Sequence, residues 1–511
     1  MVLLDKRNAI NSRIASRSRI LATLLTGIGF LVVPVLIIVL DPIQMIVNCK
    51  LRLAKGTIMY NIIQHEIPAA RISIYVFNIT NADRFLSGED YKLKVEEVGP
   101  FVFQEYRWYI DLEPSEDGKS MGMTPKVRSE FVPEASIAHP KDVNLTLPNL
   151  IFLSSVAFLS NYPGFIGTTF NILAAQMGAE PIINMSVHNY LWDYHDPLVA
   201  LVNSLAPGLV YFEQFGLLDR LYENETDYRL LVGATDQDRF KIKTVKRVRH
   251  LDNNYTTESE ITFKEDTYEG GGYPPMLTPE VPINLYRLGI CRTVNLEYIG
   301  SRIMEEYGGE ALVYTMNNST FLNNINPITS KTYPDGLMDI SQCYYGLPFV
   351  LSKTRFLDCD PKLRDRIDGK EPDREEHVNE FVIDRKAGIA FQTKMALQFS
   401  LMLGDVSFNR KTKIMSNSVI PVTHVKLSQP AMTEGTMSKF VLVYRIAPYI
   451  MLCLEIMSVL IGLAFLGYGI RMIYLNQTST TRGIVFQSMI DKKPINAEQP
   501  LIKQENLKLK K

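Results

Sequence analysis

Two long apolar segments stand out in the hydropathy pattern of this 511-residue chain. Residues Ile20–Leu40 include no charged side chain over 21 positions, and Ile446–Ile470 run for 25 positions with Glu455 as their one charge. A helix rises about 1.5 Å per residue, so each segment is long enough to cross a hydrocarbon core of ~30 Å. The pattern predicts one transmembrane helix near each end of the chain.

Basic residues gather on the terminal side of both segments. The two terminal stretches together carry 13 basic and 4 acidic residues, whereas the stretch between the apolar segments carries 41 basic and 50 acidic residues. Cytoplasmic flanks of membrane spans are rich in Lys and Arg, so both termini are predicted to face the cytosol. No small-residue cleavage site follows the first segment, which we interpret as an uncleaved anchor. The predicted organisation is cytosolic 1–19, transmembrane 20–40, extracellular or luminal 41–445, transmembrane 446–470 and cytosolic 471–511.

The sequons for N-glycosylation follow the same division. Seven Asn-x-Ser/Thr motifs lie between the predicted spans, and an eighth, at Asn476, lies in the predicted cytosolic tail and should stay unmodified. Two of the seven overlap, so one glycan is expected for that pair. The candidate glycosylation sites are Asn78, Asn144, Asn184, Asn224, Asn254, Asn317 and Asn318.

The segment between the spans has a mixed secondary-structure pattern. Helical patterns cover residues 150–177 and 190–218, and residues 384–388 are typical of a turn between two strands. No internal repeat or low-complexity linker divides the segment, so one α+β domain is predicted. Alternating polar and apolar positions predict strands at residues 71–77, 101–106, 240–245 and 389–393.

Residues 143–179 carry no charge at all. A turn sequence at residues 161–164, Asn-Tyr-Pro-Gly, breaks them into pieces too short to cross a bilayer. Two interpretations stay open for these pieces. They form either a helical hairpin packed on the core or an apolar cap that touches lipid or a hydrophobic ligand.

Composition and motifs exclude several functional classes. The net charge of −1 and the acidic segment between the spans give no reason to expect nucleic acid as a partner. The seven histidines are scattered without metal-ligand spacing, and no Gly-x-Ser-x-Gly, His-Glu-x-x-His or Walker motif occurs. We therefore expect neither an enzyme nor a cofactor or metal site.

Five motifs between the spans occur in an order that resembles the class B scavenger receptor family. The resemblance extends over nearly the whole segment and includes the two-span topology. The motifs are Ile-Tyr-Val-Phe-Asn-Ile-Thr-Asn at 74–81, Val-Glu-Glu-Val-Gly-Pro-Phe-Val-Phe at 95–103, Leu-Trp-Asp-Tyr-His-Asp-Pro at 191–197, Gly-Gly-Gly-Tyr-Pro-Pro at 270–275 and Asp-Ile-Ser-Gln-Cys at 339–343.

The resemblance implies a fold for the segment between the spans. Two transmembrane helices flank one large ectodomain, which has an antiparallel β-barrel core, an internal tunnel and an apical helical bundle near Leu150–Leu191. The family usually has three external disulfides, and this chain matches one, Cys291 with Cys343. Closing that loop stabilises the fold by roughly 4 kcal/mol in the chain-entropy model. Sequence spacing alone allows three pairings of the four external cysteines, and the state of Cys49 and Cys359 stays open.

The resemblance also implies a function, that of a scavenger or lipid receptor. Its ligands would be fatty acids, sterols, phospholipids or lipoproteins, with apoptotic cells or proteins as further partners. They would pass through the tunnel to the membrane or be taken up by endocytosis, because an apolar conduit replaces a costly passage through water. Lipoprotein-binding relatives carry lysines ahead of the Trp motif. Here residues 176–181 hold no cation and one Glu, which favours a neutral lipid or a protein ligand.

Location and alternatives complete the sequence-based expectations. The membrane is expected to be the plasma membrane or, alternatively, that of endosomes and lysosomes. Glu498, Leu501 and Ile502 resemble an acidic dileucine sorting signal, with the acid one position nearer the first leucine than in that signal. Two alternative functions stay open: a two-span ligand-gated channel, and an endolysosomal protein-trafficking receptor without lipid transport. The role of Glu455 and the oligomeric state are also left open.

Overall fold

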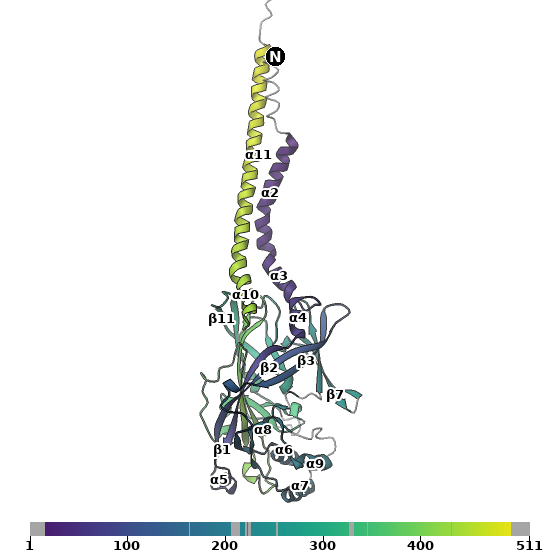
Figure 1. Ribbon diagram of the computed structural model, residues 1–511, viewed down its shortest axis with the longest axis vertical. Coiled ribbons are helices and arrows are strands. Elements are labelled where there is room, and N and C mark those ends of the chain that lie inside the picture. Colours follow the sequence, from purple (N-terminus) through teal and green to yellow (C-terminus); the bar gives the residue numbers. More distant parts are fainter. Residues whose placement is uncertain are drawn as a thin grey trace, which may run out of the picture. The chain divides into compact units, whose positions relative to one another are not determined.

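The computed structural model of the protein describes residues 16–491 except for the gaps 163, 206–214, 220–221, 223–225, 252–253, 326–331, 345 and 431. The chain divides into two compact units (Figure 1). The first comprises Met1–Met45 and Arg445–Lys511, and its described part is helical. The second comprises Ile46–Tyr444 and holds every strand that the structure describes.

The helical unit consists of α2 (Arg17–Leu40) and α11 (Ala447–Asp491), which contain the two apolar segments. Both helices are long and apolar enough to cross a membrane. Ser16 caps the start of α2, where its hydroxyl oxygen accepts a hydrogen bond from the Arg19 backbone N–H. α2 nearly coincides with the first apolar segment, whereas α11 has 45 residues and continues well beyond the second segment, 446–470.

Glycines let α2 and α11 approach each other closely. A Cβ atom added to Gly27 would lie 2.9 Å from Leu466 Cγ and 3.0 Å from the Gly462 carbonyl oxygen. Phe30 and Phe465 stack across the same pair of helices, with ring centroids 6.1 Å apart. Small residues at a helix–helix contact are the usual means of close packing in a membrane, where burial from water supplies no driving force between helices.

The large unit contains short helices and two sheets. The helices after α2 are α3 (Pro42–Leu51), α4 (Ile58–Gln64), α5 (Ala82–Ser87), α6 (Leu150–Leu159), α7 (Gly164–Gln176), α8 (Val187–Trp192), α9 (Pro197–Leu205) and α10 (Glu434–Val441). Within this unit α6, α7 and α9 lie at one end, and α4 and α10 lie at the other (Figure 1). The strands are β1 (Ile67–Ile79), β2 (Leu93–Pro114), β3 (Ser120–Phe131), β4 (Asn144–Pro148), β5 (Ile182–Ser186), β6 (Thr226–Gly233), β7 (Ile242–Leu251), β8 (Asn254–Thr262), β9 (Thr267–Tyr268), β10 (Ile283–Arg287), β11 (Arg292–Ile303), β12 (Glu310–Met316), β13 (Met338–Asp339), β14 (Phe349–Lys353), β15 (Ile367–Asp368), β16 (Glu380–Asp384), β17 (Ala390–Met402) and β18 (Val419–Ser428).

The main sheet is long and open. Its neighbours follow the order β8-β7-β6-β3-β2-β1-β18-β17-β16-β12-β11-β10-β9, with β13, β14 and β15 attached beside this path. Most pairs are antiparallel, and the short pairs β9–β10 and β15–β2 are parallel. An isolated bridge joins Lys241 to Tyr268, but no ladder among the described residues closes the path on itself. The sheet-rich domain expected from the sequence is present, and closure of a barrel stays a prediction.

The centre of the sheet shows why an alternating sequence forms these strands. In β1 the side chains of Ile72, Ile74 and Val76 are all buried and belong to the main core. Residues on one side of a strand recur every second position, so one face of β1 packs inward while its backbone pairs with β2 and β18. The strand predicted at 71–77 is confirmed within β1.

The other local expectations have mixed outcomes. The strands predicted at 101–106 and 389–393 coincide with β2 and β17, the turn at 384–388 joins β16 to β17, and 240–245 overlaps β7. The helix predicted over 190–218 is interrupted at residues 193–196, between α8 and α9, and is wrong in its last part. Residues 206–214 lie outside the described residues, and Phe215 forms a β-bridge with Tyr194 because tertiary pairing overrides the local helical pattern.

A buried arginine ties three distant segments together. Arg239 is fully buried, and its guanidinium donates to the backbone carbonyls of Tyr273 at 3.1 Å, Leu51 at 3.4 Å and Ala387. Burial lowers the pKa of Arg239 to about 10, so the group stays cationic at neutral pH. Three carbonyl dipoles thus offset the cost of removing this charge from water.

The glycine contact of the helical unit gives a testable prediction. Gly27→Leu should separate α2 from α11, because the larger side chain overpacks their contact at a cost of ~1–3 kcal/mol. Gly29→Leu is the control and should leave the helices in contact, because a Cβ at Gly29 has no neighbour within 4 Å. The measurement is the rate of oxidative cross-linking between Phe30→Cys and Phe465→Cys in membranes, in a chain without Cys49 and Cys453. Equal rates for the two leucine variants would contradict this packing.

Candidate functional site

The uncharged stretch 143–179 forms two helices with different surroundings. Every side chain of α6 is buried, so this helix is part of the core. On α7, Phe170 and Ala174 are buried, whereas Phe165 is 71% exposed and Ile172 is 57% exposed. The hairpin interpretation thus applies to α6, while α7 presents an exposed face without charge, on which Phe165 and Ile172 lie with Thr168 and Thr169 between them.

The loop between β17 and β18 holds α7 in place. A Cβ atom on Gly167 would lie 2.8 Å from the Phe408 ring, so the close approach of helix and loop depends on glycine. Asn171 Nδ2 donates to the Phe408 carbonyl at 3.0 Å, and Asn409 Nδ2 donates to Asn171 Oδ1 at 2.7 Å. These contacts fix the exposed face of α7 relative to the sheet.

The same loop brings cations to this end of the domain. Lys411 Nζ lies 2.6 Å from Glu180 Oε1 and also donates to the Ala179 carbonyl at 2.8 Å. Arg410 and Lys413 flank it and are exposed. The sequence comparison of residues 176–181 missed these cations because Lys411 stands 231 positions beyond Glu180. The surface around α7 therefore carries positive charge from the β17–β18 loop, although residues 176–181 themselves hold no cation.

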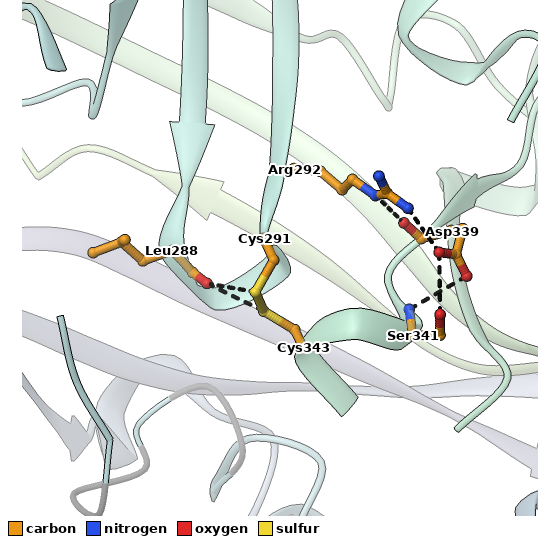
Figure 2. The surroundings of a disulfide bond; sticks show 6 residues. All are labelled: Leu288, Cys291, Arg292, Asp339, Ser341 and Cys343. Carbon is orange, nitrogen blue, oxygen red and sulfur yellow. Dashed lines mark hydrogen bonds and ion pairs between the residues drawn. A yellow bond between two sulfur atoms is a disulfide. The ribbon is translucent and has the colours of Figure 1, made fainter. Parts of the chain in front are cut away.

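The structure joins Cys291 to Cys343, the pair that the resemblance implied (Figure 2). Their Cα atoms are 5.7 Å apart, and the bond connects the turn before β11 to the short 3-10 helix Ser341–Tyr344. The Leu288 carbonyl oxygen lies 3.3 Å from Cys343 Sγ. The bridge fastens the β10–β11 turn to a segment 52 positions away in the sequence.

An ion pair beside the disulfide reinforces this link (Figure 2). Arg292 Nη2 lies 2.7 Å from Asp339 Oδ2, and its Nε donates to the Asp339 carbonyl. Asp339 is fully buried and also accepts hydrogen bonds from Ser341 and Tyr333. A buried carboxylate needs such partners, so Asp339 depends on the same closed loop that the disulfide completes.

The two cysteines whose state the sequence left open are both free thiols. Cys49 is exposed on α3, whereas Cys359 is half-buried against Gly336, whose carbonyl oxygen lies 3.4 Å from Cys359 Sγ. Burial raises the pKa of the Cys359 thiol to about 12. The thiolate is the reactive form of cysteine, so the Cys359 thiol is unreactive in this fold.

The candidate glycosylation sites occupy different surroundings. Asn144 and Asn184 are exposed on the small β4–β5 sheet. Asn78 is half-buried on β1, and its Oδ1 accepts a hydrogen bond from the Thr146 backbone N–H at 3.0 Å. Asn254 is the first residue of β8.

The overlapping sequons cap a short helix. Asn317 Oδ1 accepts from the Ser319 backbone N–H, and exposed Asn318 accepts from Lys353 Nζ. The candidate site Asn224 and the candidate sorting residues lie outside the described part of the chain; those sorting residues are Glu498, Leu501 and Ile502.

A buried ionic centre, which sequence reasoning missed, joins β2 to the loop segments beside it. Arg355 forms two hydrogen bonds with Glu97, at 2.6 and 2.8 Å, and two with Glu376, at 2.9 and 3.5 Å. Burial acts to raise the pKa of Glu97, but Arg355 and the neighbouring His424 ring outweigh it and hold that pKa far below its usual range. Burial acts in the same direction on Glu376, where Lys426 and Arg355 outweigh it and lower the pKa to about 2.

Two buried histidines adjoin this centre. His424 Nδ1 lies 3.5 Å from Glu97 Oε1, and the His424 and His377 rings meet edge to face with centroids 5.8 Å apart. Neither nitrogen of His424 has a hydrogen-bond partner among the described residues. Burial lowers the pKa of both rings, so the folded state favours their neutral forms.

Acidification should therefore destabilise the large unit. The folded-state pKa values of His377 and His424 lie below their ordinary value, so the stabilisation that these rings contribute is present at pH 7 and is lost as the pH falls below about 6.5. The pKa of Glu97 is also lowered, from an ordinary value near 4.5, so the stabilisation from this carboxylate is lost only below about pH 4.5. His424→Phe should reduce the fall in Tm between pH 7 and pH 5, measured by intrinsic fluorescence of the full chain in nanodiscs. Exposed His195 supplies the control, and an unchanged pH dependence in His424→Phe would oppose this assignment.

Comparisons with known proteins place these features in a family. The sequence model of the CD36 family matches residues 20–473. Scavenger receptor class B member 1 from Bos taurus is 26% identical over 475 residues, which cover 88% of this chain and 90% of the relative. Lysosome membrane protein 2 from Mus musculus is 24% identical over 434 residues, covering 81% of this chain and 86% of the relative. The resemblance seen in the sequence motifs is thereby confirmed, and the chain belongs to the CD36 family.

Proposed function

We propose that this protein is a receptor for hydrophobic ligands and that the exposed face of α7 is where they first bind. The observation that carries this proposal is an uncharged helix with Phe165 and Ile172 in water, in a chain whose relative is named a scavenger receptor. Apolar surface costs ~25 cal/mol per Å² to keep in water, so a lipid that covers these side chains gains that free energy.

The interior of the main sheet is the proposed route for the ligand. Its path is open between β8 and β9, and an isolated bridge between Lys241, which precedes β7, and Tyr268 in β9 supports closure. We propose that the sheet closes into a barrel around a tunnel, through which fatty acids, sterols or phospholipids reach the membrane, or that bound lipoprotein is taken up by endocytosis. No chemical step is required, so we propose no enzymatic activity.

The proposed topology places residues 41–445 outside the cytosol and both termini within it. α10 lies at the opposite end of the large unit from α7 and directly precedes the apolar segment 446–470 (Figure 1). This arrangement supports a membrane-distal α7. Asn144 and Asn184 are exposed and should carry glycans. Glycosidase treatment of the chain from eukaryotic cells should lower its mass, and Asn144→Gln with Asn184→Gln should reduce that shift, whereas an unmodified chain would contradict the topology.

A second function is favoured by the relative named Lysosome membrane protein 2. In this case the chain would work in endosomal or lysosomal membranes as a trafficking receptor for proteins, without lipid transport. The candidate sorting residues near the C-terminus would direct it there, whereas their loss would leave the chain at the plasma membrane. Family membership argues against the other alternative, a ligand-gated channel.

Uptake measurements test the proposed binding face. Cells that express Phe165→Asp with Ile172→Asp should take up fluorescent fatty acid or cholesteryl ester at least about tenfold less well, since two large apolar contacts are lost. The matched control is Ile299→Asp, a change on β11 at an isoleucine that is 58% exposed. Surface expression of each variant is measured in parallel. Normal uptake by the double variant would refute the proposal, and normal protein sorting without any lipid uptake would favour the trafficking receptor.

A further inference from the structure

The hairpin between β11 and β12 ends against the last residues before the second apolar segment. Its turn, residues 304–309, is closed by a hydrogen bond from the Met304 backbone N–H to the Gly309 carbonyl at 2.9 Å. A Cβ atom on Gly309 would lie 2.8 Å from the Tyr444 ring, so the turn and the ring are in direct contact. Tyr444 stands two positions before Ile446, where the apolar segment begins. The hairpin turn therefore lies close to the point at which the chain enters that segment.

A buried carboxylate fixes this contact. Asp384, the last residue of β16, is fully buried, and it accepts hydrogen bonds from the Tyr307 hydroxyl at 2.9 Å and from the Tyr444 hydroxyl at 2.5 Å. The Ala387 backbone N–H donates to the same side chain at 2.6 Å. The Tyr307 ring also meets the rings of Phe440 and Tyr444, with centroids 5.0 and 5.1 Å away. Loss of either hydroxyl would leave the carboxylate short of a partner, so the hairpin turn and the end of α10 are held together.

Exposed apolar side chains gather at this end of the large unit. Ile303, the last residue of β11, is 65% exposed, although Met304 beside it is buried. Ile62 on α4 and Leu442, directly after α10, are exposed as well. The elements α4, β11 and α10 all lie at the same end of this unit (Figure 1). Apolar surface is costly to keep in water, so exposed apolar residues at one end of a domain mark an interaction surface.

The second apolar segment brings a bilayer within reach of Ile303. Ile303 is paired across the hairpin with Glu310, and the residue before Glu310 is Gly309, which contacts Tyr444. The Cα atoms of such partners lie ~4.5–5.5 Å apart, so Ile303 is near the residue that leads into the segment. The head-group layer of a bilayer extends roughly 5–8 Å outside its hydrocarbon core. A bilayer around residues 446–470 therefore reaches the end of the hairpin.

The charges beside Ile303 indicate which kind of leaflet it meets. Glu305 and Glu306 are exposed in the hairpin turn. The nearest cation of β11, Arg302, is paired with Glu380 at 3.3 Å. An anionic membrane surface attracts basic segments and repels carboxylates, whereas phosphatidylcholine presents a quaternary ammonium ion beside its phosphate. Carboxylates at head-group level, next to an isoleucine that reaches the acyl chains, are therefore suited to a zwitterionic leaflet.

We propose that the end of the β11–β12 hairpin rests in the zwitterionic, non-cytosolic leaflet of the bilayer, with Ile303 as an apolar anchor at the boundary between head groups and acyl chains. The partner is the bulk bilayer and not a transported ligand, and the contact fixes the large unit against the membrane beside the second span. The inference rests on the proposed topology and goes beyond it, because that topology places residues 41–445 outside the cytosol without saying which of them touch lipid.

The test measures membrane depth with a fluorescent probe on the full chain in phosphatidylcholine nanodiscs. Ile303→Cys, in a chain without Cys49 and Cys453, is labelled with a nitrobenzoxadiazole probe, and doxyl-labelled phosphatidylcholine serves as the quencher. A side chain ~5–10 Å into the interface should lose at least about half of its fluorescence. Ile299→Cys is the matched control, since it lies on the same strand with similar exposure but about 13 Å farther from the turn, and it should keep its fluorescence.

The outcomes separate this contact from the topology on which it rests. A probe on Leu460→Cys, an exposed position in the second apolar segment, should be quenched if that segment spans the bilayer. Quenching at Leu460→Cys without quenching at Ile303→Cys, or equal quenching at Ile303→Cys and Ile299→Cys, would overturn the contact and leave the topology intact. Absence of quenching at Leu460→Cys would contradict both. Discs rich in phosphatidylserine should quench the Ile303→Cys probe less, and stronger quenching there would overturn the assignment to a zwitterionic leaflet.

Discussion

The need to neutralise buried charge fixes the arrangement of the large unit. An ion taken out of water costs several kcal/mol unless other groups replace its hydration, so each buried arginine must find partners wherever the chain can supply them. Arg239 finds carbonyls on three segments, Arg107 finds glutamates on β2 and after β9, and Arg355 finds Glu97 at a separation of 258 positions. Removing one partner would leave the others uncompensated, so these centres hold distant segments together.

Glu105, Arg107 and Glu269 are charged residues among apolar ones. The buried apolar residues near them in the sequence belong to two clusters, the main core, which includes Phe103 and Tyr268, and a second cluster around Tyr109. A core built only for stability would gain from apolar residues at these positions, since charge pairs in a protein interior seldom improve on good packing. Charge is nonetheless retained there, and Arg107 is paired with both carboxylates, at 3.1 Å from Glu105 Oε1 and 2.8 Å from Glu269 Oε1.

Local sequence patterns predicted the elements well and their assembly only in part. The apolar segments and the alternation in 71–77 depend on neighbouring residues, so α2, α11 and β1 could be read directly. The pairing of Lys411 with Glu180 and that of Arg107 with Glu269 depend on the strand order, which no local pattern encodes. The helix expected to reach Leu218 failed for the same reason, since Phe215 pairs with Tyr194 through tertiary structure. The disulfide pairing and the family membership were predicted instead from the order of several motifs along the chain.

The end of the domain around α7 combines two surfaces that respond differently to the medium. Phe165 and Ile172 interact by excluding water, which dissolved salt barely weakens, whereas Arg410 and Lys413 act through a field that is screened within ~8 Å at physiological ionic strength. Raising the ionic strength would thus weaken the electrostatic attraction of Arg410 and Lys413 for a ligand, while the hydrophobic contacts of α7 would keep their strength. A ligand captured by its charge would dissociate, and one captured by its hydrocarbon would stay.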